Sequence, residues 1–147
     1  MVDEAFEIVA VLTAGLFAGA AIYITAVEHP ARLDCGTALA VREFAPSYRR
    51  ATVMQASLAV LGLLAAVAAW WRSGHGGLLV GGLLLGAVVP FTLLGILPTN
   101  RCLLAPSLDP ESREAAALLR RWGRLHAVRS VLGGMAFGTL LVCVAQT

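Results

Sequence analysis

The sequence predicts an all-α integral membrane protein, a bundle of four helices that each cross the bilayer. Hydrophobic residues make up 59% of the 147 residues and charged residues only 14%, whereas a soluble domain is about 45–50% apolar and about 25% charged. The mean hydropathy of +0.80 reflects the same excess. The apolar residues form continuous runs and do not alternate with polar ones, which indicates helices and not a β-barrel. We therefore expect a single transmembrane domain, 1–147, surrounded by lipid.

Four segments are long enough to span a membrane. A hydrocarbon core of ~30 Å requires about 20 apolar residues in a helix. The segments that meet this requirement are 8–27, 51–71, 76–97 and 125–145. The chain starts with acidic residues, unlike a secretory signal peptide, so we expect the first span to be retained. Glycine pairs four residues apart in the first, third and fourth spans predict close helix packing, and Pro90 predicts a kink in the third.

The arginines predict the orientation of the chain. All 11 basic residues are Arg; four lie between the first two spans, five between the last two, and only Arg72 lies in the turn between the second and third. The positive-inside rule then places both long loops in the cytoplasm and both termini outside. The absence of Lys and the bias toward Ala, Gly, Leu and Val are typical of a GC-rich bacterium. We expect a multi-pass protein of the bacterial inner (cytoplasmic) membrane.

Each long loop is expected to contain helix. The segment Gly36 to Phe44 predicts a short interfacial helix in the first loop, which Pro46 would end. In the second loop, Asp109 is a candidate N-cap for a helix that has Pro110 in its first turn. We expect this helix to run without a break into the fourth span.

Polar side chains gather at the cytoplasmic ends of all four predicted spans. Because these ends meet at one end of a bundle, their side chains can face one another across it. They are candidates for a substrate-binding or catalytic site. The residues are Glu28, His29, Tyr48, Gln55, Asn100, Arg101, Trp122, His126 and Arg129.

The strongest local pattern is Trp122-x3-His126-x2-Arg129 in the fourth span. At about 100° per residue the three side chains share one helix face within an arc of about 60°. Arg129 lies about one turn inside the membrane, where a charge is costly unless it faces the bundle interior. The alternative is that Arg129 snorkels to the interface or forms a structural pair with Glu28.

His29 lies on the face of the first span that also carries Gly15 and Gly19, and this face is expected to point inward. Together with His126 and Glu28 it would form a two-His, one-carboxylate set, which suits non-haem iron. Copper is a further alternative. Adjacent Glu28 and His29 point about 100° apart on a helix, which disfavours this set. Haem is disfavoured because both imidazoles lie at one level and four short helices leave little room.

Other classes of site have little support. The three cysteines are widely spaced and form no CxxC pair, so neither a zinc site nor a disulfide framework is indicated. The net charge of +2 and the absence of a basic face argue against nucleic-acid binding. His75 lies in a Ser-Gly-His-Gly-Gly turn and is expected to be solvated. No phosphate-binding glycine loop or nucleophile elbow is present.

Three motifs occur in order: Val27-Glu28-His29-Pro30-Ala31-Arg32, Leu97-Pro98-Thr99-Asn100-Arg101 and Trp122-x2-Leu125-His126-x2-Arg129. With them, essentially the whole chain resembles the family of small four-span membrane proteins that includes the fungal anthrone oxygenases. The resemblance implies an oxygenase that converts an anthrone-type polyketide to an anthraquinone with dioxygen and without an obvious cofactor.

The resemblance also suggests roles for the candidate residues. His126 or His29 is the expected base, since an imidazole can exchange protons near neutral pH. Arg129, with Asn100, would stabilise the oxyanion, and Trp122 and Tyr48 would stack on a flat aromatic substrate.

The alternative is a non-enzymatic membrane binding module or a small subunit of a larger membrane complex. A homodimer sharing a pocket is also expected, because four short helices enclose little volume.

Overall fold

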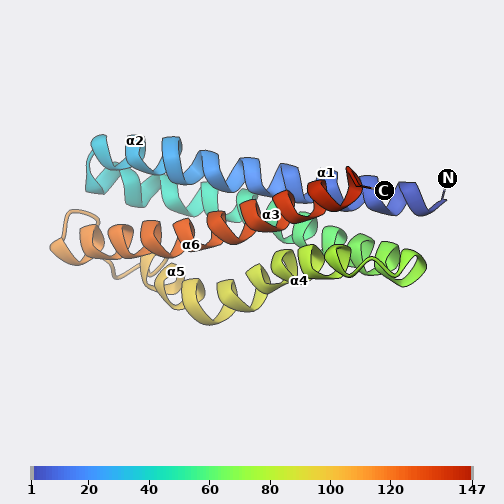
Figure 1. Ribbon diagram of the computed structural model, residues 1–147. Coiled ribbons are helices and arrows are strands. Elements are labelled where there is room, and N and C mark those ends of the chain that lie inside the picture. The colour runs from blue at the N-terminus through green and yellow to red at the C-terminus, as the bar shows by residue number, and fades with distance from the viewer. Residues whose placement is uncertain (1, 147) are drawn as a thin grey trace.

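The computed structural model describes residues 2–146, and its regular elements are all helical, as the sequence predicts. In chain order the elements are α1 (Val2–Tyr23), the π-helical turn η1 (Ile24–Glu28), α2 (His29–Asp34), α3 (Thr37–Ser73), α4 (Gly76–Phe91), the π-helical turn η2 (Thr92–Ile96), α5 (Leu97–Leu103) and α6 (Arg113–Val144) (Figure 1). They join into four long rods, because η1 connects α1 to α2 and η2 connects α4 to α5.

The four rods are long and apolar enough to cross a membrane. They cover Glu4–Asp34, Thr37–Ser73, Gly76–Leu103 and Arg113–Val144. Each rod contains one predicted span, except that the fourth rod ends one residue before the end of the predicted span 125–145. At about 1.5 Å per residue, α3 with its 37 residues is about 55 Å long. This length exceeds a hydrocarbon core of ~30 Å, so the charged ends of the rods can extend beyond it.

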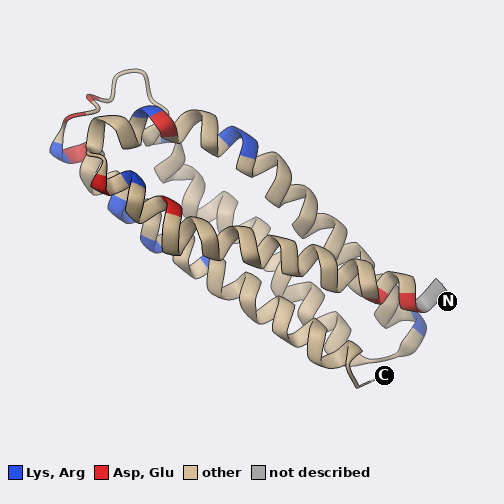
Figure 2. Cartoon of the chain, turned by 90° about the horizontal axis from the view of Figure 1, so that it is seen from above, with Lys and Arg blue, Asp and Glu red and all other residues tan. Residues whose placement is uncertain are grey.

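The rods pack as an antiparallel bundle. α1 and α4 each pack against both α3 and α6, which places α1 and α4 on opposite sides of the bundle (Figure 1). Both termini and the α3–α4 turn lie at one end, and α2, α5 and the two long loops lie at the other. Most charged side chains gather at this second end, which we call the loop end (Figure 2).

The interior contains two apolar clusters with polar residues between them. The larger cluster fills the half near the termini and includes Phe17, Leu85 and Leu140. The smaller one fills the loop end and includes Phe44 and Trp122. Several buried or half-buried polar side chains lie between residues of the two clusters along the rods: Thr25, Gln55, Thr92, His126 and Ser130.

Close packing explains several of the glycines. A Cβ at Gly81 would lie 2.6 Å from Cγ of Leu140, and a Cβ at Gly82 would lie 2.7 Å from Cβ of Ala66. α4 therefore approaches α6 and α3 through backbone, as glycine pairs in apolar helices do. Gly134 and Gly138 of α6 meet nothing within 4 Å, so the pair in the fourth span makes no such contact inside this chain.

The first loop differs from the prediction. The segment Gly36 to Phe44 is not a separate interfacial helix, because α3 runs continuously from Thr37 to Ser73 with Pro46 inside it. The prediction that Pro46 ends a helix was wrong. A proline removes one backbone bond and clashes with the preceding turn, but this site is only two and a half turns from the helix start, and the helix continues through it.

The second loop also differs in where its helix begins. α6 starts at Arg113, and its N-cap is Ser112, whose Oγ accepts a hydrogen bond from the Ala115 N–H at 3.1 Å. Asp109 instead closes a turn, with Oδ1 accepting from the Glu111 N–H at 3.0 Å. The predicted Asp109 cap was therefore wrong, while the unbroken continuation into the fourth span is confirmed.

Two π-helical turns, which the sequence analysis did not predict, shape the loop end. The His29 N–H bonds to the Ile24 carbonyl in η1, and the Leu97 N–H bonds to the Thr92 carbonyl in η2. A proline follows each of these donors directly, Pro30 and Pro98. Because proline has no N–H and its ring crowds the preceding turn, a wider turn before it is one way to accommodate the loss. The third rod changes direction as α4 passes through η2 into α5 (Figure 1).

Candidate functional site

The candidate site is built around a stack of three rings at the loop end. The Trp122 indole lies against the His126 imidazole, with ring centroids 4.7 Å apart and planes inclined by 25°. His29 of α2 lies against the same indole, with centroids 5.0 Å apart. Phe44 of α3 meets Trp122 edge-on at 5.4 Å. The two imidazoles thus belong to one buried cluster, in which both contact the indole.

A small cavity of about 30 Å³ opens beside this stack. A cavity of this size holds one or two molecules as small as water. Six of the residues singled out in the sequence line it: Glu28, Tyr48, Gln55, Trp122, His126 and Arg129. Seven further residues complete the wall: Ile24, Arg32, Phe44, Ser47, Ala51, Thr52 and Ile96.

Three of the predicted residues do not line the cavity. His29 is buried against Trp122, and both nitrogens of its ring lack a hydrogen-bond partner among the described residues. Asn100 of α5 is 1% exposed but lies outside the cavity wall. Arg101 is exposed. His126, and not His29, is therefore the imidazole that a small molecule in this cavity would meet.

A chain of hydroxyl groups orients His126. Nδ1 of His126 lies 3.0 Å from Oγ1 of Thr25, which lies 2.7 Å from Oγ of Ser130. Oγ of Ser130 in turn donates to the carbonyl oxygens of Ala21 at 2.9 Å and of His126 itself at 3.1 Å. Thr25 is in η1, so the π-helical turn contributes the hydroxyl that the ring contacts.

The proton count along this chain favours one tautomer of a neutral His126. A hydroxyl has a single hydrogen to donate. With the Ser130 hydrogen on a carbonyl oxygen, Thr25 donates to Ser130 and Nδ1 of His126 donates to Thr25. This is an assignment from the hydrogen-bond pattern. It leaves Nε2 without a hydrogen, as the basic nitrogen of the ring.

Arg129 is a buried cation without an anionic partner. Its guanidinium lies 5.2 Å from the ring centroid of Phe17, a cation–π contact. Within residues 2–146 it forms no ion pair, and its Nε has no hydrogen-bond partner. The expected alternative, a structural pair with Glu28, is not formed. An anionic oxygen in the cavity would supply the missing partner.

Other buried polar atoms of the site are also without partners. Gln55 is 1% exposed, yet its amide nitrogen and oxygen both lack hydrogen bonds among the described residues. The same holds for the Trp122 indole N–H and for the Asn100 side-chain amide. Buried groups of this kind are normally satisfied by protein, water or ligand. The cavity wall thus presents several polar atoms available to a ligand.

Glu28 has a structural partner network. It forms an ion pair with Arg32 and accepts a hydrogen bond from the Ser47 hydroxyl at 3.0 Å. Arg32 is 7% exposed and also pairs with Glu43 of α3. The network ties the end of the first rod to α3. Since its ionic partners are already present, Glu28 is the least available polar residue of the cavity wall.

The alternative metal set is not assembled. Glu28 is paired with Arg32, and His29 and His126 each contact the Trp122 indole. No group of three His, Cys, Asp or Glu side chains suited to a metal occurs in the described part of the chain. A haem would need far more space than the cavity of about 30 Å³ beside these rings. The donors present therefore do not fit either group.

The site also contains residues that sequence reasoning missed. Thr25 and Ser130 orient His126, while Arg32, Phe44 and Ser47 complete the wall. Some of them carried a usable signal. Glu28 and Arg32 are four residues apart on a helix, as are His126 and Ser130, and this spacing brings side chains together. Phe44 and Ser47 carried no comparable signal, because Phe44 belongs to the segment assigned to a separate helix and Ser47 lies between that segment and the second predicted span.

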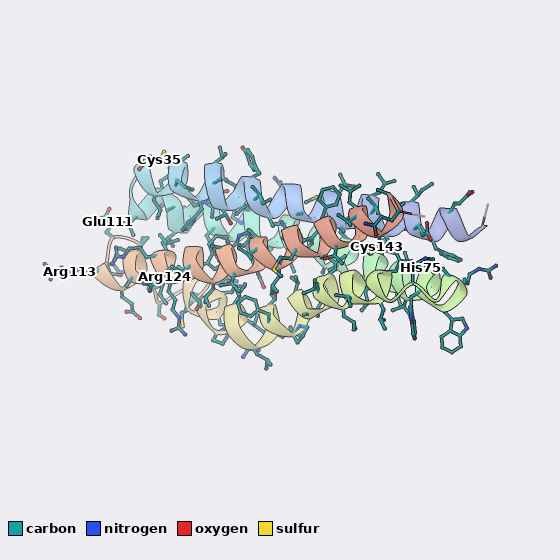
Figure 3. All side chains as sticks on the ribbon, in the orientation of Figure 1. Cys35, His75, Glu111, Arg113, Arg124 and Cys143 are labelled. Carbon is teal, nitrogen blue, oxygen red and sulfur yellow. The ribbon has the colours of Figure 1, made fainter. Side chains whose placement is uncertain are left out.

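The remaining reactive side chains lie away from the cavity. His75 is exposed in the α3–α4 turn near the termini, and Cys143 also lies toward that end (Figure 3). Cys35 lies at the loop end, as do Glu111, Arg113 and Arg124 (Figure 3). Cys35, Cys102 and Cys143 are all free thiols.

Fold and site together define a class: a small bundle of four helices able to cross a membrane, with a buried polar cavity at one end. The sequence profile of the anthrone oxygenase family matches residues 44–139 of the chain. The chain belongs to this family, as the resemblance of its motifs predicts.

Two curated relatives extend the match over most of the chain. Anthrone oxygenase tpcL of Aspergillus fumigatus is 31% identical over 132 residues, which cover 83% of this chain and 82% of the relative. An anthrone oxygenase of Claviceps purpurea is 29% identical over 141 residues, covering 84% and 80%. No solved structure matches the chain.

Proposed function

We propose that the protein oxygenates a lipophilic anthrone-type substrate to the corresponding quinone with dioxygen, within the membrane. Family membership supports the reaction class. The observation on which the proposal chiefly rests is that an oriented imidazole and an unpaired guanidinium line one cavity. A packing subunit would not require these groups, since each is costly to bury without a partner.

The first proposed step is proton transfer. The methylene carbon of an anthrone lies opposite its carbonyl group, and losing a proton from that carbon leaves a negative charge largely on the carbonyl oxygen. Nε2 of His126 accepts the proton, since Nδ1–H is held by Thr25. Arg129 stabilises the oxyanion as it develops, in surroundings from which water is largely excluded.

The remaining steps require dioxygen and no other oxidant. The anion transfers one electron to dioxygen, and the two resulting radicals combine into a peroxide anion at the former methylene carbon. The proton held by Nε2 of His126 returns to this anion and gives the hydroperoxide, so the imidazole is again free to act as a base. The base then removes the second hydrogen of that carbon as a proton. The O–O bond breaks, the carbon becomes a carbonyl, and the departing hydroxide takes up a proton to form water. One anthrone and one dioxygen thus give one quinone and one water.

Further groups of the site are assigned to binding. Trp122 and Tyr48 present aromatic rings to the cavity, on which a flat substrate can stack. Gln55 and the Trp122 N–H offer hydrogen bonds to its oxygen substituents. We assign Glu28 the role of pairing with Arg32, and His29 the role of packing against the Trp122 indole.

We also propose an orientation in the bacterial inner membrane, with both termini outside and the loop end in the cytoplasm. The support is that nine of the 11 arginines lie in the two long loops, on the same side of the predicted spans. The candidate site would then lie near the cytoplasmic face. As a single transmembrane domain the chain could act alone or as a homodimer.

The reaction itself is testable with purified protein in lipid nanodiscs. Anthrone should be consumed with an equal amount of dioxygen, anthraquinone should form, and the rate should exceed that of empty nanodiscs by at least about 10²-fold. A rate equal to that of the empty nanodiscs would overturn the proposal and favour a binding module or a subunit of a larger complex.

A further inference from the structure

We infer that the aromatic substrate enters from the bilayer through a lateral hollow between α3 and η2 and binds there, with its reacting edge toward the cavity. The inference rests on the proposed function for the identity of the substrate. The cavity of about 30 Å³ is far too small for a tricyclic molecule, since ligand sites usually measure about 300–1,000 Å³. The ring system must therefore lie mainly outside it.

A larger hollow of about 130 Å³ adjoins the cavity, and because it is open outward, part of the ring system can remain in the surrounding lipid. The two spaces share Tyr48, Thr52, Gln55 and Arg129 in their walls. A ligand in the hollow would thus meet the guanidinium that lacks an anionic partner and the amide that lacks hydrogen bonds. Gln55 is 1% exposed, so this polar group is fully buried at the point where hollow and cavity meet.

The outer part of the hollow is open to the surroundings of the bundle. Its rim includes Thr52, Ala56 and Leu93, which are exposed, whereas Ala59 and Val88 on its floor are buried. At this level the third rod has passed through Pro90 into η2 and changed direction (Figure 1). Apolar walls that open toward lipid acyl chains suit a flat hydrophobic molecule dissolved in the membrane.

A second groove flanks the cavity between α1 and α3, but it suits such a molecule less well. Glu43, Arg50 and Glu28 line this groove. Its inner end is closed by the ion pairs that Arg32 makes with Glu28 and Glu43. An apolar ring would have to displace charged groups there, which is unfavourable. The hollow beside η2 instead leads to polar groups without partners.

The placement makes distinct predictions for the two reactants. The anthrone rings occupy the hollow between α3 and η2, with the oxygen toward Gln55 and Arg129. Dioxygen, which is about as small as water, occupies the cavity beside His126. Ala56 then becomes a specificity-determining position, because a larger side chain at the rim would fill the space of the substrate.

Binding of anthraquinone, which cannot be oxygenated, tests the site independently of turnover. The variant with Trp70→Phe and Trp71→Phe keeps Trp122 as its single indole, and quenching of its fluorescence in nanodiscs reports the ligand. In this background Ala56→Phe should weaken binding at least about tenfold, and Val53→Phe should leave it unchanged. Val53 is 71% exposed on the same helix and lines neither the hollow nor the cavity.

Two results would overturn the inference: equal affinity of the Ala56→Phe variant, or no quenching of Trp122 by anthraquinone. If anthraquinone binds at Ala56 while anthrone is not oxygenated in nanodiscs, the binding site stands and the proposed function fails.

Discussion

Trp122 lies stacked on His126, with ring centroids 4.7 Å apart, and also contacts His29, with centroids 5.0 Å apart. The indole thus contacts both imidazoles that the sequence brings to one end of the bundle. Only His126 reaches the cavity. This arrangement gives the two histidines different expected roles, one as the base and the other as support for the indole.

Arg129 is expected to stabilise the oxyanion. Arg129→Gln removes the charge that has no partner in the described chain, and we expect kcat for anthrone to fall about 10²–10³-fold. Arg129→Lys keeps the charge but loses the planar donor fork, so its kcat should lie between that of wild type and that of Arg129→Gln. Measuring kcat and KM for both variants in nanodiscs checks this. Equal activity of Arg129→Gln and wild type would exclude the oxyanion role.

Thr25 is expected to act as a positioning residue. Thr25→Val keeps the shape but removes the hydroxyl that accepts from Nδ1 of His126. The Nδ1–H tautomer should then lose its preference, and kcat should fall by at least about tenfold. Nitrogen-15 NMR of labelled histidine reports the tautomer directly, with Thr25→Ser as the variant that restores it. An unchanged tautomer in Thr25→Val would contradict the proton count.

Gly123 is expected to be required for the position of His29. A Cβ at this site would lie 2.6 Å from Nε2 of His29. Gly123→Ala should therefore displace the ring and destabilise the fold by about 1–3 kcal/mol. Gly134→Ala on the same helix is the matched control, because a Cβ there meets nothing within 4 Å. Thermal unfolding in detergent compares the two, and equal stability would show that His29 moves aside freely.

The native cysteines can report the orientation. Cys35 and Cys102 are exposed at the loop end. If that end is cytoplasmic, a membrane-impermeant maleimide should label them in inverted vesicles and not in intact, right-side-out ones. Cys35→Ser with Cys102→Ser controls for labelling of Cys143. Labelling of Cys35 in right-side-out vesicles would reverse the proposed topology.

The sequence was sufficient to predict the bundle because lipid imposes few solutions. Continuous apolar runs of about 20 residues fix four helices, and antiparallel connections then bring His29, Trp122 and His126 to one end. Helical spacing also places Trp122, His126 and Arg129 on a single face, and all three line the cavity. Both predictions use the length of apolar runs and the helical repeat, and both quantities can be read from a single sequence.

Details that depend on several helices at once could not be read in this way. Pro46 continues a helix where the local rule predicts an end. The π-helical turns η1, which carries Thr25, and η2, which lines the hollow, were not predicted because a proline alone does not specify them, as Pro46 inside α3 shows. The contact between His29 and Trp122 is also a packing result, since spacing along separate helices does not determine which rings meet.

The most direct measurement compares oxygen uptake with anthrone by wild type, His126→Ala and His75→Ala in nanodiscs. His75 is exposed at the opposite end of the bundle. We expect His126→Ala to lower kcat by about 10²–10⁴-fold and His75→Ala to match wild type. Turnover by His126→Ala at the wild-type rate would contradict the assignment of the cavity imidazole as the base.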